Sequence, residues 1–586
     1  MKTYQYLWRM IRYRPVLYTV NAFLWLLIHL TPLIPGLIVQ QFFNRLPQIG
    51  HLDTELWLLA ALLVATTLAR VVLIFMGGWI DALHRFSMNG LLQRNLLECI
   101  LERPGARAVP SSPGEALSRF RDDTEQAENA ISWTLDAIGR GTFTIVAIVI
   151  LLRINVLITL LVFVPLVCVV AIVQVMSKRL EGYRRSSRQA TGRVTSAIGE
   201  IFGTVQAIQV ASAEEHVVAN FRTLSDQRRR AALRDRVLSE TLNSTFGNTV
   251  GLGTGLILIL AAQTLQQGQL GIGDLALFIY YLGFVTDFTQ FFGMFLAYYT
   301  QTNVAFERMD TLLQGAPPEQ LVAHHPLYLQ DSVPALTTPV KSDIHHLETL
   351  DAADLVYRYP DTGRGIEGIH VHLKRGTLTV IVGRIGSGKT TLLQVLLGLL
   401  PKDAGEIRWN GVLVEDPANF FVPPRSAYTA QIPHLFSATL KENILLGLPE
   451  QQVNVQVALH TAVMDYDLAQ LEEGLETVIG TKGVKLSGGQ AQRTAAARMF
   501  VRDAELYVFD DLSSALDVET EHLLWERLFN AGERTCLVVS HRRAVLQRAD
   551  HIVVLKDGMM EAEGALTALL EHSEEMQRLW HGQLSP

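Results

Sequence analysis

The chain has 586 residues, of which 49% are hydrophobic and only 18% charged, and this is too apolar for one soluble domain of that length. Acidic residues number 57 against 50 basic ones, so no overall basic field favours binding to nucleic acid. Its three cysteines, Cys99, Cys168 and Cys536, are too widely separated for a disulfide framework or a metal-ligand cluster. The composition predicts a membrane portion joined to a soluble portion.

Apolar runs of membrane-spanning length occupy the first three hundred residues. A bilayer needs about 20 consecutive apolar residues, and the apolar cores of four of these runs contain at most one formal charge. Two further runs are interrupted by charged residues. We predict an all-α transmembrane domain over 1–310, with six spans at about residues 16–43, 55–81, 131–152, 156–176, 241–267 and 273–301.

Basic residues in the connections predict the orientation, because Lys and Arg favour the cytoplasmic face. They precede the first span and recur between residues 178 and 230. The connections that follow the odd-numbered spans, by contrast, contain few basic residues beyond Arg45 and Arg153. We therefore predict a multi-pass integral protein of a bacterial inner (plasma) membrane, in contact with lipid. Both termini and the soluble domain would be cytoplasmic.

The two long cytoplasmic connections, residues 82–130 and 177–240, have the composition and spacing of helical extensions. Each contains a local break, at Pro110–Asp123 and at Ala211–Phe221. A short transverse segment or an ordinary helix-to-helix turn would fit there.

Ionisable residues inside the spans are candidates for contact with a transported substrate. Asp136 and Arg140 lie four residues apart within the third span, where they would face each other on one helix and neutralise each other. We favour this structural role for the pair.

Residues 311–345 are rich in proline without sustained periodicity, and they are predicted to be a linker. The domain that follows, 346–586, has an α/β pattern. Its β-rich run Leu378–Val382 leads through a glycine loop into the apolar helix Leu392–Leu400, which is the context of a phosphate-binding loop. The loop consists of Gly383, Arg384, Ile385, Gly386, Ser387, Gly388, Lys389 and Thr390.

This loop predicts a site for ATP and Mg²⁺. Glycines let backbone N–H groups turn onto phosphate oxygens, and the helix N-terminus adds partial positive charge. Lys389 would reach the β- and γ-phosphates, and the hydroxyl of Thr390 would bind Mg²⁺. Asp510, which ends the apolar run 506–509, would hold the same ion, although an isolated aspartate there could equally cap a helix.

Between the two nucleotide motifs, Leu486 is followed by Ser487, Gly488, Gly489 and Gln490, which resemble the signature sequence of ATP-binding cassette transporters. Other residues match the family's motifs in chain order. Taken singly, the aromatic residue and the histidine among these matches would more often be ordinary surface residues. The resemblance implies that Tyr359 stacks on adenine, that Gln431 contacts Mg²⁺ and the attacking water, that Asp517 belongs to the loop crossing the dimer interface (Ser513–Asp517), and that His541 contacts the γ-phosphate.

Six spans before one cassette resemble the half-size exporters of this family. The resemblance implies a dimer with a second half-transporter, in which each ATP lies between one chain's phosphate loop and the other chain's signature residues. It also implies ATP hydrolysis that drives alternating access and exports a hydrophobic or amphipathic substrate such as a drug, lipid or peptide. An ATP-gated regulator or channel with the same fold is the alternative, while the spans argue against a soluble cassette acting on DNA or ribosomes.

Two positions depart from the family pattern. Asp511 stands where the family has the catalytic glutamate, and Thr481 stands where many exporters have a glutamate before the signature. The shorter side chain of Asp511 would place its carboxylate farther from the attacking water. Two assemblies stay open: a heterodimer in which the partner supplies a glutamate, and a homodimer in which Asp511 acts as the base.

Overall fold

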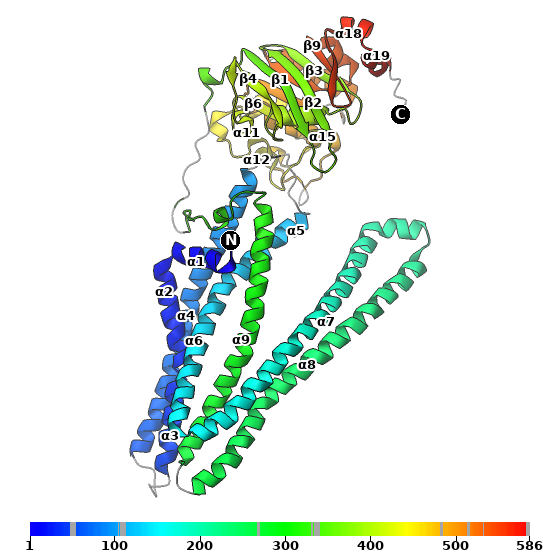
Figure 1. Ribbon diagram of the computed structural model, residues 1–586. Coiled ribbons are helices and arrows are strands. Elements are labelled where there is room, and N and C mark those ends of the chain that lie inside the picture. Colours follow the sequence, from blue (N-terminus) through cyan, green and yellow to red (C-terminus); the bar gives the residue numbers. More distant parts are fainter. Residues whose placement is uncertain are drawn as a thin grey trace. The chain divides into compact units, whose positions relative to one another are not determined.

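The computed structural model describes residues 1–46, 54–102, 105, 113–266, 270–329, 332, 340–480, 484–512, 516–530 and 532–581, with only the backbone at 113, 162, 165–181, 242, 243, 245–247, 249, 250, 252 and 263. The chain divides into two compact units (Figure 1). The first comprises Met1–Ile100 and Val109–Leu329, and the second Leu101–Ala108 and Gln330–Pro586.

The first unit is helical in its described part, which agrees with the predicted fold class. Its elements are α1 (Thr3–Tyr13), α2 (Pro15–Leu30), α3 (Leu33–Arg45), α4 (Thr54–Leu101), α5 (Pro113–Ser118), the π-helical turn η2 (Arg119–Asp123), α6 (Thr124–Ile154), α7 (Val156–Val210), α8 (Glu214–Gln266), α9 (Ile272–Leu312) and the 3-10 turn η3 (Pro318–Val322).

Local sequence explains several of the helix boundaries. Pro15 occupies the first turn of α2, where its missing N–H costs no helical hydrogen bond. Pro32 precedes α3 and separates it from α2. The side chain of Asn155 caps α7 by accepting a hydrogen bond from the Ile158 N–H at 3.0 Å. These breaks divide the apolar sequence into separate helices.

Four helical stretches in the described part are long and apolar enough to cross a membrane: Pro15–Arg45, Thr54–Leu101, Gly114–Ile154 and Ile272–Leu312. They contain the first, second, third and sixth predicted spans. The fourth predicted span and the described part of the fifth fall within α7 and α8, where many side chains lie outside the described residues.

Two packed clusters stabilise the first unit. In one, α1 lies against α9, with the ring of Tyr6 stacked on Phe306 at 4.3 Å and its hydroxyl donating to Asp310 at 2.6 Å. In the other, α3 packs on α9, where the Tyr281 hydroxyl donates to the carbonyl of Leu33 at 2.9 Å. α7 and α8 pair along their lengths as a hairpin (Figure 1).

The connections between helices differ in detail from the sequence analysis. In the described part of the first break, α5 and η2 form a short helical segment. At the second, the chain only turns at Ala211–Ala213, because Ser212 adopts φ +50°, and α8 then begins at Glu214. The start of the predicted linker is also structured: α9 continues to Leu312, and η3 follows, with Leu321 and Val322 buried in the first unit.

The second unit contains two sheets. A four-stranded antiparallel sheet has the order β2-β1-β4-β5, and a six-stranded, mainly parallel sheet has the order β10-β9-β3-β8-β7-β6. The strands are β1 (Thr349–Arg358), β2 (Gly365–Lys374), β3 (Leu378–Gly383), β4 (Ala404–Trp409), β5 (Val412–Leu413), β6 (Ser426–Thr429), β7 (Leu506–Asp510), β8 (Thr535–Val539), β9 (His551–Lys556) and β10 (Met559–Gly564).

Helices connect and follow the strands of this unit. They are α10 (Lys389–Leu396), α11 (Pro417–Phe420), α12 (Leu440–Leu445), α13 (Val455–Thr461), α14 (Asp465–Gln470), α15 (Gly488–Phe500), α16 (Val518–Asn530), α17 (Arg543–Arg548), α18 (Leu566–His572) and α19 (Glu574–His581), with 3-10 turns at Asp343–His345, Glu450–Gln452 and Gly474–Glu476.

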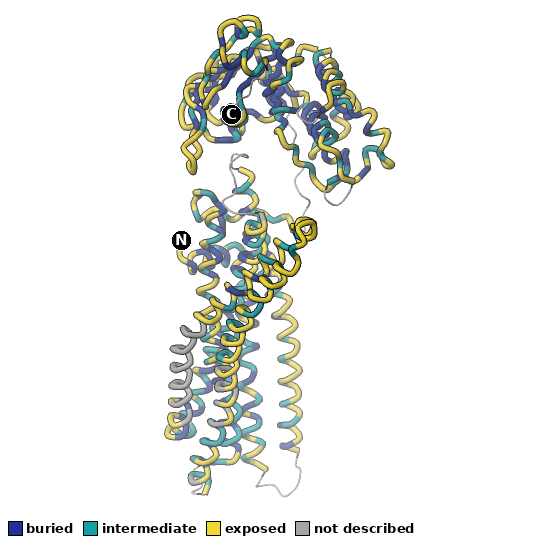
Figure 2. Tube along the Cα trace, turned by 90° about the vertical axis from the view of Figure 1, so that its right-hand side faces the viewer, coloured by how far each residue is buried: buried dark blue, intermediate teal, exposed yellow. Residues whose placement is uncertain are grey.

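Strands β3, β7 and β8 are buried at every residue, as expected for parallel strands covered on both faces. Figure 2 shows this buried core inside the sheet-containing unit, beneath an exposed surface. Phe509 exemplifies the packing: it is fully buried and meets Trp525 edge to face, with ring centroids 5.4 Å apart. The rigid strands end at one edge, where their loops can hold functional groups in place.

Candidate functional site

Four neighbouring parallel strands, β3, β8, β7 and β6, deliver most of the predicted nucleotide residues to one edge of the sheet. Their carboxyl ends lie side by side, and the phosphate loop (383–390) follows β3. His541 follows β8 by two residues, Gln431 follows β6 by two, and Asp510 and Asp511 stand at and just beyond the end of β7. Residues between positions 383 and 541 of the sequence therefore meet at one site.

The phosphate loop has the backbone that its glycines predict. Gly386 and Gly388 adopt φ of +83° and +98°, a left-handed conformation that other residues rarely adopt. A Cβ at Gly383 would lie 2.3 Å from the carbonyl oxygen of Leu555. Gly388 immediately precedes α10, so the loop leads into a helix N-terminus, where a phosphate group would be stabilised.

Lys389 closes over this loop. Its Nζ donates to the carbonyl oxygens of Gly383 at 2.8 Å and Arg384 at 2.7 Å. Burial lowers the pKa of Lys389, and the neighbouring charges of Asp510 and Asp511 oppose that shift. The ammonium is thus held at the loop and remains near two carboxylates.

Thr390 and Asp510 form the pair expected to hold Mg²⁺. The Thr390 hydroxyl donates to Oδ1 of Asp510 at 3.2 Å, and Asp510 is 1% exposed. Its Oδ2 and the Oγ of Ser387 are buried without a hydrogen-bond partner. Burial raises the pKa of Asp510. A hard cation bound by oxygen atoms fits this donor set and would satisfy the orphaned carboxylate oxygen.

The described residues include no cluster of three or more His, Cys, Asp or Glu side chains able to hold a metal ion.

Asp511 lies next to Gln431, whose Nε2 donates a long hydrogen bond of 3.5 Å to Oδ2 of the carboxylate. Its other oxygen, Oδ1, is buried without a hydrogen-bond partner. Burial raises the pKa of Asp511, while the nearby charge of His541 lowers it. The backbone of Asp511 is left-handed, with φ +51°, and its N–H donates to Val539 at 3.0 Å. A carboxylate with a raised pKa beside an amide is suited to accept a proton from water.

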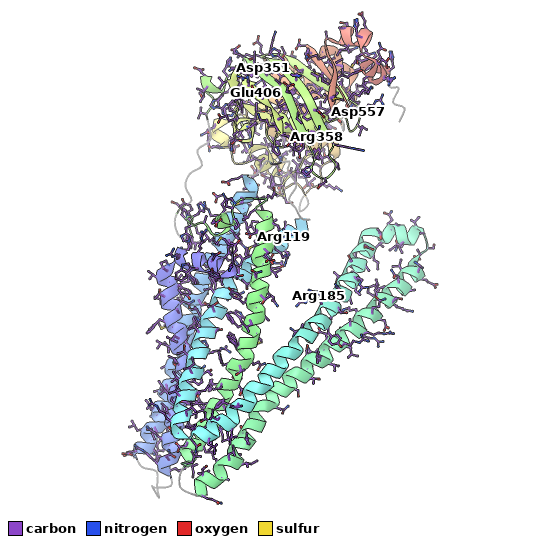
Figure 3. All side chains as sticks on the ribbon, in the orientation of Figure 1. Arg119, Arg185, Asp351, Arg358, Glu406 and Asp557 are labelled. Carbon is purple, nitrogen blue, oxygen red and sulfur yellow. The ribbon has the colours of Figure 1, made fainter. Side chains whose placement is uncertain are left out.

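Tyr359 directly follows β1, after Arg358, which is labelled in Figure 3. Its hydroxyl lies 3.3 Å from Oγ1 of Thr391 in α10, and its ring meets Tyr357 edge to face at 5.0 Å. The side chain is 37% exposed. An aromatic face is thus available beside the helix that follows the phosphate loop.

The signature residues begin α15. Ser487 caps this helix through a reciprocal pair of hydrogen bonds with Gln490, of 3.2 and 2.9 Å. The Gln490 amide also donates to Asp467 at 3.1 Å, and Arg493 donates to the same carboxylate from Nε at 3.1 Å and from Nη2 at 2.7 Å. Ser487 and Gly488 remain exposed at the helix N-terminus.

Asp467 is a residue that the sequence analysis missed. It lies 23 positions before Gln490 on α14, and nothing in the local pattern links the two. Asp517 caps α16, accepting from the Thr520 N–H at 2.9 Å and from its hydroxyl at 2.8 Å. Ser513, Ser514, Ala515 and Thr481 lie outside the described residues.

Charged residues in the first unit differ from expectation. Asp136 pairs with His29 of α2 at 2.8 Å, and Arg140 lies over the ring of Phe291 at 4.2 Å. Among the described ion pairs none joins Asp136 to Arg140, so the predicted mutual neutralisation is wrong. Gly139 explains the choice of partner, since a Cβ there would come within 2.4 Å of the His29 ring.

Two family models match this chain. Residues 18–288 match the ABC transporter transmembrane region, and residues 366–514 match the ABC transporter family. A solved structure described as a bacterial Atm1-family ABC exporter with ATP bound superimposes with a TM-score of 0.75, covering 97% of this chain and 98% of the other at 20% identity. At that identity the likeness concerns the fold.

Curated relatives are 26% identical over most of the chain. The ATP-dependent lipid A-core flippase of Vibrio vulnificus (strain YJ016) aligns over 82% of this chain and 80% of its own length. Antigen peptide transporter 2 of Homo sapiens aligns over 81% and 67%. ABC transporter B family member 1 of Dictyostelium discoideum aligns over 87% of this chain, which spans only 56% of that relative.

Proposed function

Because this chain belongs to the ATP-binding cassette transporters and has the order of a half-size exporter, a transmembrane region followed by one ATPase cassette, we propose that it is a subunit of an ATP-driven exporter. The observation that carries this proposal is the gathering of the phosphate loop, Asp510, Asp511, Gln431 and His541 at the ends of four adjacent strands. The match of residues 366–514 to the ABC transporter family supports ATP hydrolysis, and the long apolar helices support a place in the membrane.

In this proposal the phosphate loop binds the triphosphate of ATP. The backbone N–H groups of residues 386–390 face the phosphates, and the Lys389 ammonium moves from the carbonyls of Gly383 and Arg384 to the β- and γ-phosphate oxygens. Tyr359 stacks on the adenine ring. The lysine thereby exchanges two carbonyl acceptors for phosphate oxygens.

Thr390, Asp510 and Gln431 would hold Mg²⁺, which neutralises phosphate charge when it is bound with ATP. Asp511 accepts the proton of the attacking water, and Gln431, whose Nε2 lies 3.5 Å from Oδ2 of Asp511, helps to orient that water. His541 contacts the γ-phosphate from the end of β8. The weakest part of this arrangement is Asp511, because its carboxylate is one methylene shorter than the glutamate it replaces.

We further propose that two such halves act as a dimer. The exposed N-terminus of α15, with Ser487, Gly488 and Gly489, would complete the nucleotide site of a facing cassette by presenting backbone N–H groups to its ATP. The side chain of Gln490 is already bound to Asp467, so its role is to stabilise the start of this helix. Asp517 would lie in the loop near the same interface.

The transmembrane domain, proposed as residues 1–310 with six spans and followed by a linker over 311–345 and a cassette over 346–586, would carry the substrate. Closure of the cassettes on ATP and their release after hydrolysis would drive alternating access. We propose a hydrophobic or amphipathic substrate, exported from a cytoplasm that contains both termini, across a bacterial inner membrane.

The first test is the Mg²⁺-dependent ATPase rate of the full chain in lipid nanodiscs, beside Lys389→Ala. We expect activity above the control if two copies form a working site with Asp511. Activity equal to the control in a dimer that still binds ATP would instead point to a glutamate-bearing partner. Failure to bind ATP at all would overturn the proposal. Substrate flux against a gradient then distinguishes an exporter from an ATP-gated regulator or channel.

A further inference from the structure

The helix α19 packs against β3 and β9 of the cassette, beside α18 (Figure 1). It lies beyond the 366–514 segment that matches the family model. The hydroxyl of Ser573 caps it, accepting from the Met576 N–H at 3.1 Å and donating to Glu561 at 2.8 Å. Met576 is fully buried in the core. α19 is therefore an integral part of the cassette.

One side chain of α19 reaches the phosphate loop. Glu575 is 1% exposed and accepts two hydrogen bonds from Arg384, from Nε at 2.5 Å and from Nη2 at 3.0 Å. Arg384 is the second residue of the loop, and its carbonyl oxygen accepts one of the Lys389 hydrogen bonds at 2.7 Å. A buried carboxylate on α19 thus fixes the residue whose main chain holds the loop's lysine.

The other end of α19 contacts the segment after β8. Arg543 donates to the carbonyl oxygen of Trp580 at 2.6 Å, and its guanidinium lies over the Trp580 ring at 5.2 Å. Arg543 stands two residues after His541. The same helix therefore touches both the phosphate loop and the loop that carries the proposed γ-phosphate contact.

We propose that α19 sets the geometry of the nucleotide site and that Glu575 is a positioning residue acting through Arg384. The physical reason is that the phosphate loop is exposed next to Arg384. The Ile385 side chain is fully solvent-exposed, so packing does not hold this part of the loop. A bidentate pair between arginine and carboxylate fixes both distance and orientation. Without this ion pair, residues 384–386 gain conformational freedom, and ATP binding must pay the entropy of ordering them.

The inference rests on the proposed nucleotide site, and the test separates the two. Binding of a fluorescent ATP analogue to the full-length protein, with Mg²⁺, is measured for Glu575→Gln. The matched control is Glu574→Gln, which breaks the exposed 3.3 Å pair with Arg578 on the same helix. Lys389→Ala reports on the nucleotide site itself. Thermal unfolding of each variant shows that it is folded.

Glu575→Gln is expected to weaken binding about tenfold, and Glu574→Gln to leave it unchanged. If Glu575 acts through Arg384, removing both side chains should do no more harm than removing one. The double variant Arg384→Gln with Glu575→Gln should therefore bind the ATP analogue as tightly as whichever single variant has the lower affinity. Unchanged or tighter binding by folded Glu575→Gln would overturn the inference, as would additive losses. Unchanged binding by Lys389→Ala would instead overturn the nucleotide site.

Discussion

Replacing Asp511 with glutamate tests the proposed chemistry most directly. The substitution extends the carboxylate by one carbon–carbon bond, about 1.5 Å, toward the place of the attacking water. Displacements of about 1 Å change rates on the order of a hundredfold, so we expect Asp511→Glu to raise the ATPase rate between about tenfold and a hundredfold. The 3.5 Å hydrogen bond from Gln431 lies at the outer limit of such contacts, which leaves the native carboxylate loosely held.

The same substitution carries a small cost in stability. Asp511 has φ +51°, and the short polar side chain of aspartate tolerates this left-handed backbone better than glutamate does. We expect the free energy of unfolding to fall by up to about 1 kcal/mol. A gain in activity would therefore accompany a slight loss of thermal stability.

The assay is steady-state ATP hydrolysis in nanodiscs at saturating Mg²⁺-ATP, with Asp511→Asn as the control that keeps the side-chain size but removes the base. Asp511→Asn should fall to the rate of Lys389→Ala. If folded, ATP-binding Asp511→Glu hydrolysed no faster than the native protein, side-chain length would not limit the site, and the argument from Asp511 would be wrong.

Three further outcomes follow from single contacts. Gly388→Ala should abolish ATP binding, because φ is +98° there and a Cβ would come within 2.9 Å of Ile366; retention of native affinity in a binding titration would contradict this. Cys536 is fully buried, which keeps reagents from the thiol and raises its pKa to about 12, so maleimide labelling followed by mass spectrometry should find it only after denaturation, and labelling of the folded protein would contradict this burial. Tyr359→Phe, which loses only the contact with Thr391, should bind ATP nearly as well as the native protein, whereas Tyr359→Ala should bind about tenfold more weakly; equal affinities for the two variants would argue against stacking.

The sequence predicted the fold class and the family because those features depend on local patterns. The run from Leu378 into the glycine loop contains its own strand, turn and helix signals, and the structure places β3, the loop and α10 there. The long apolar helices could be predicted for the same reason. Asp136 shows the limit of this reasoning, because its partner is His29, 107 residues away, on a helix whose approach depends on Gly139.

Contacts between segments distant in sequence escaped prediction for a similar physical reason. Gln490 matches the family signature, but its binding to Asp467 depends on how α14 packs beside α15. Arg384 and Glu575 are 191 residues apart and belong to elements with no shared periodicity. A salt bridge between exposed positions contributes little to stability, but this one has a carboxylate that is almost fully buried, and only the folded cassette shows it.

Asp511, which departs from the family pattern, and the signature residues at the start of α15 lie in different elements. This separation matters for the proposed dimer. Asp511 follows β7, while Ser487 and its neighbours begin α15, whose start is held by Gln490, Asp467 and Arg493 whatever stands at position 511. A substitution at 511 can therefore weaken hydrolysis at this chain's own phosphate loop without disturbing what α15 offers a facing cassette. If two halves pair as proposed, a slow site at this chain's own phosphate loop would therefore not prevent the chain from completing a fast site on its partner.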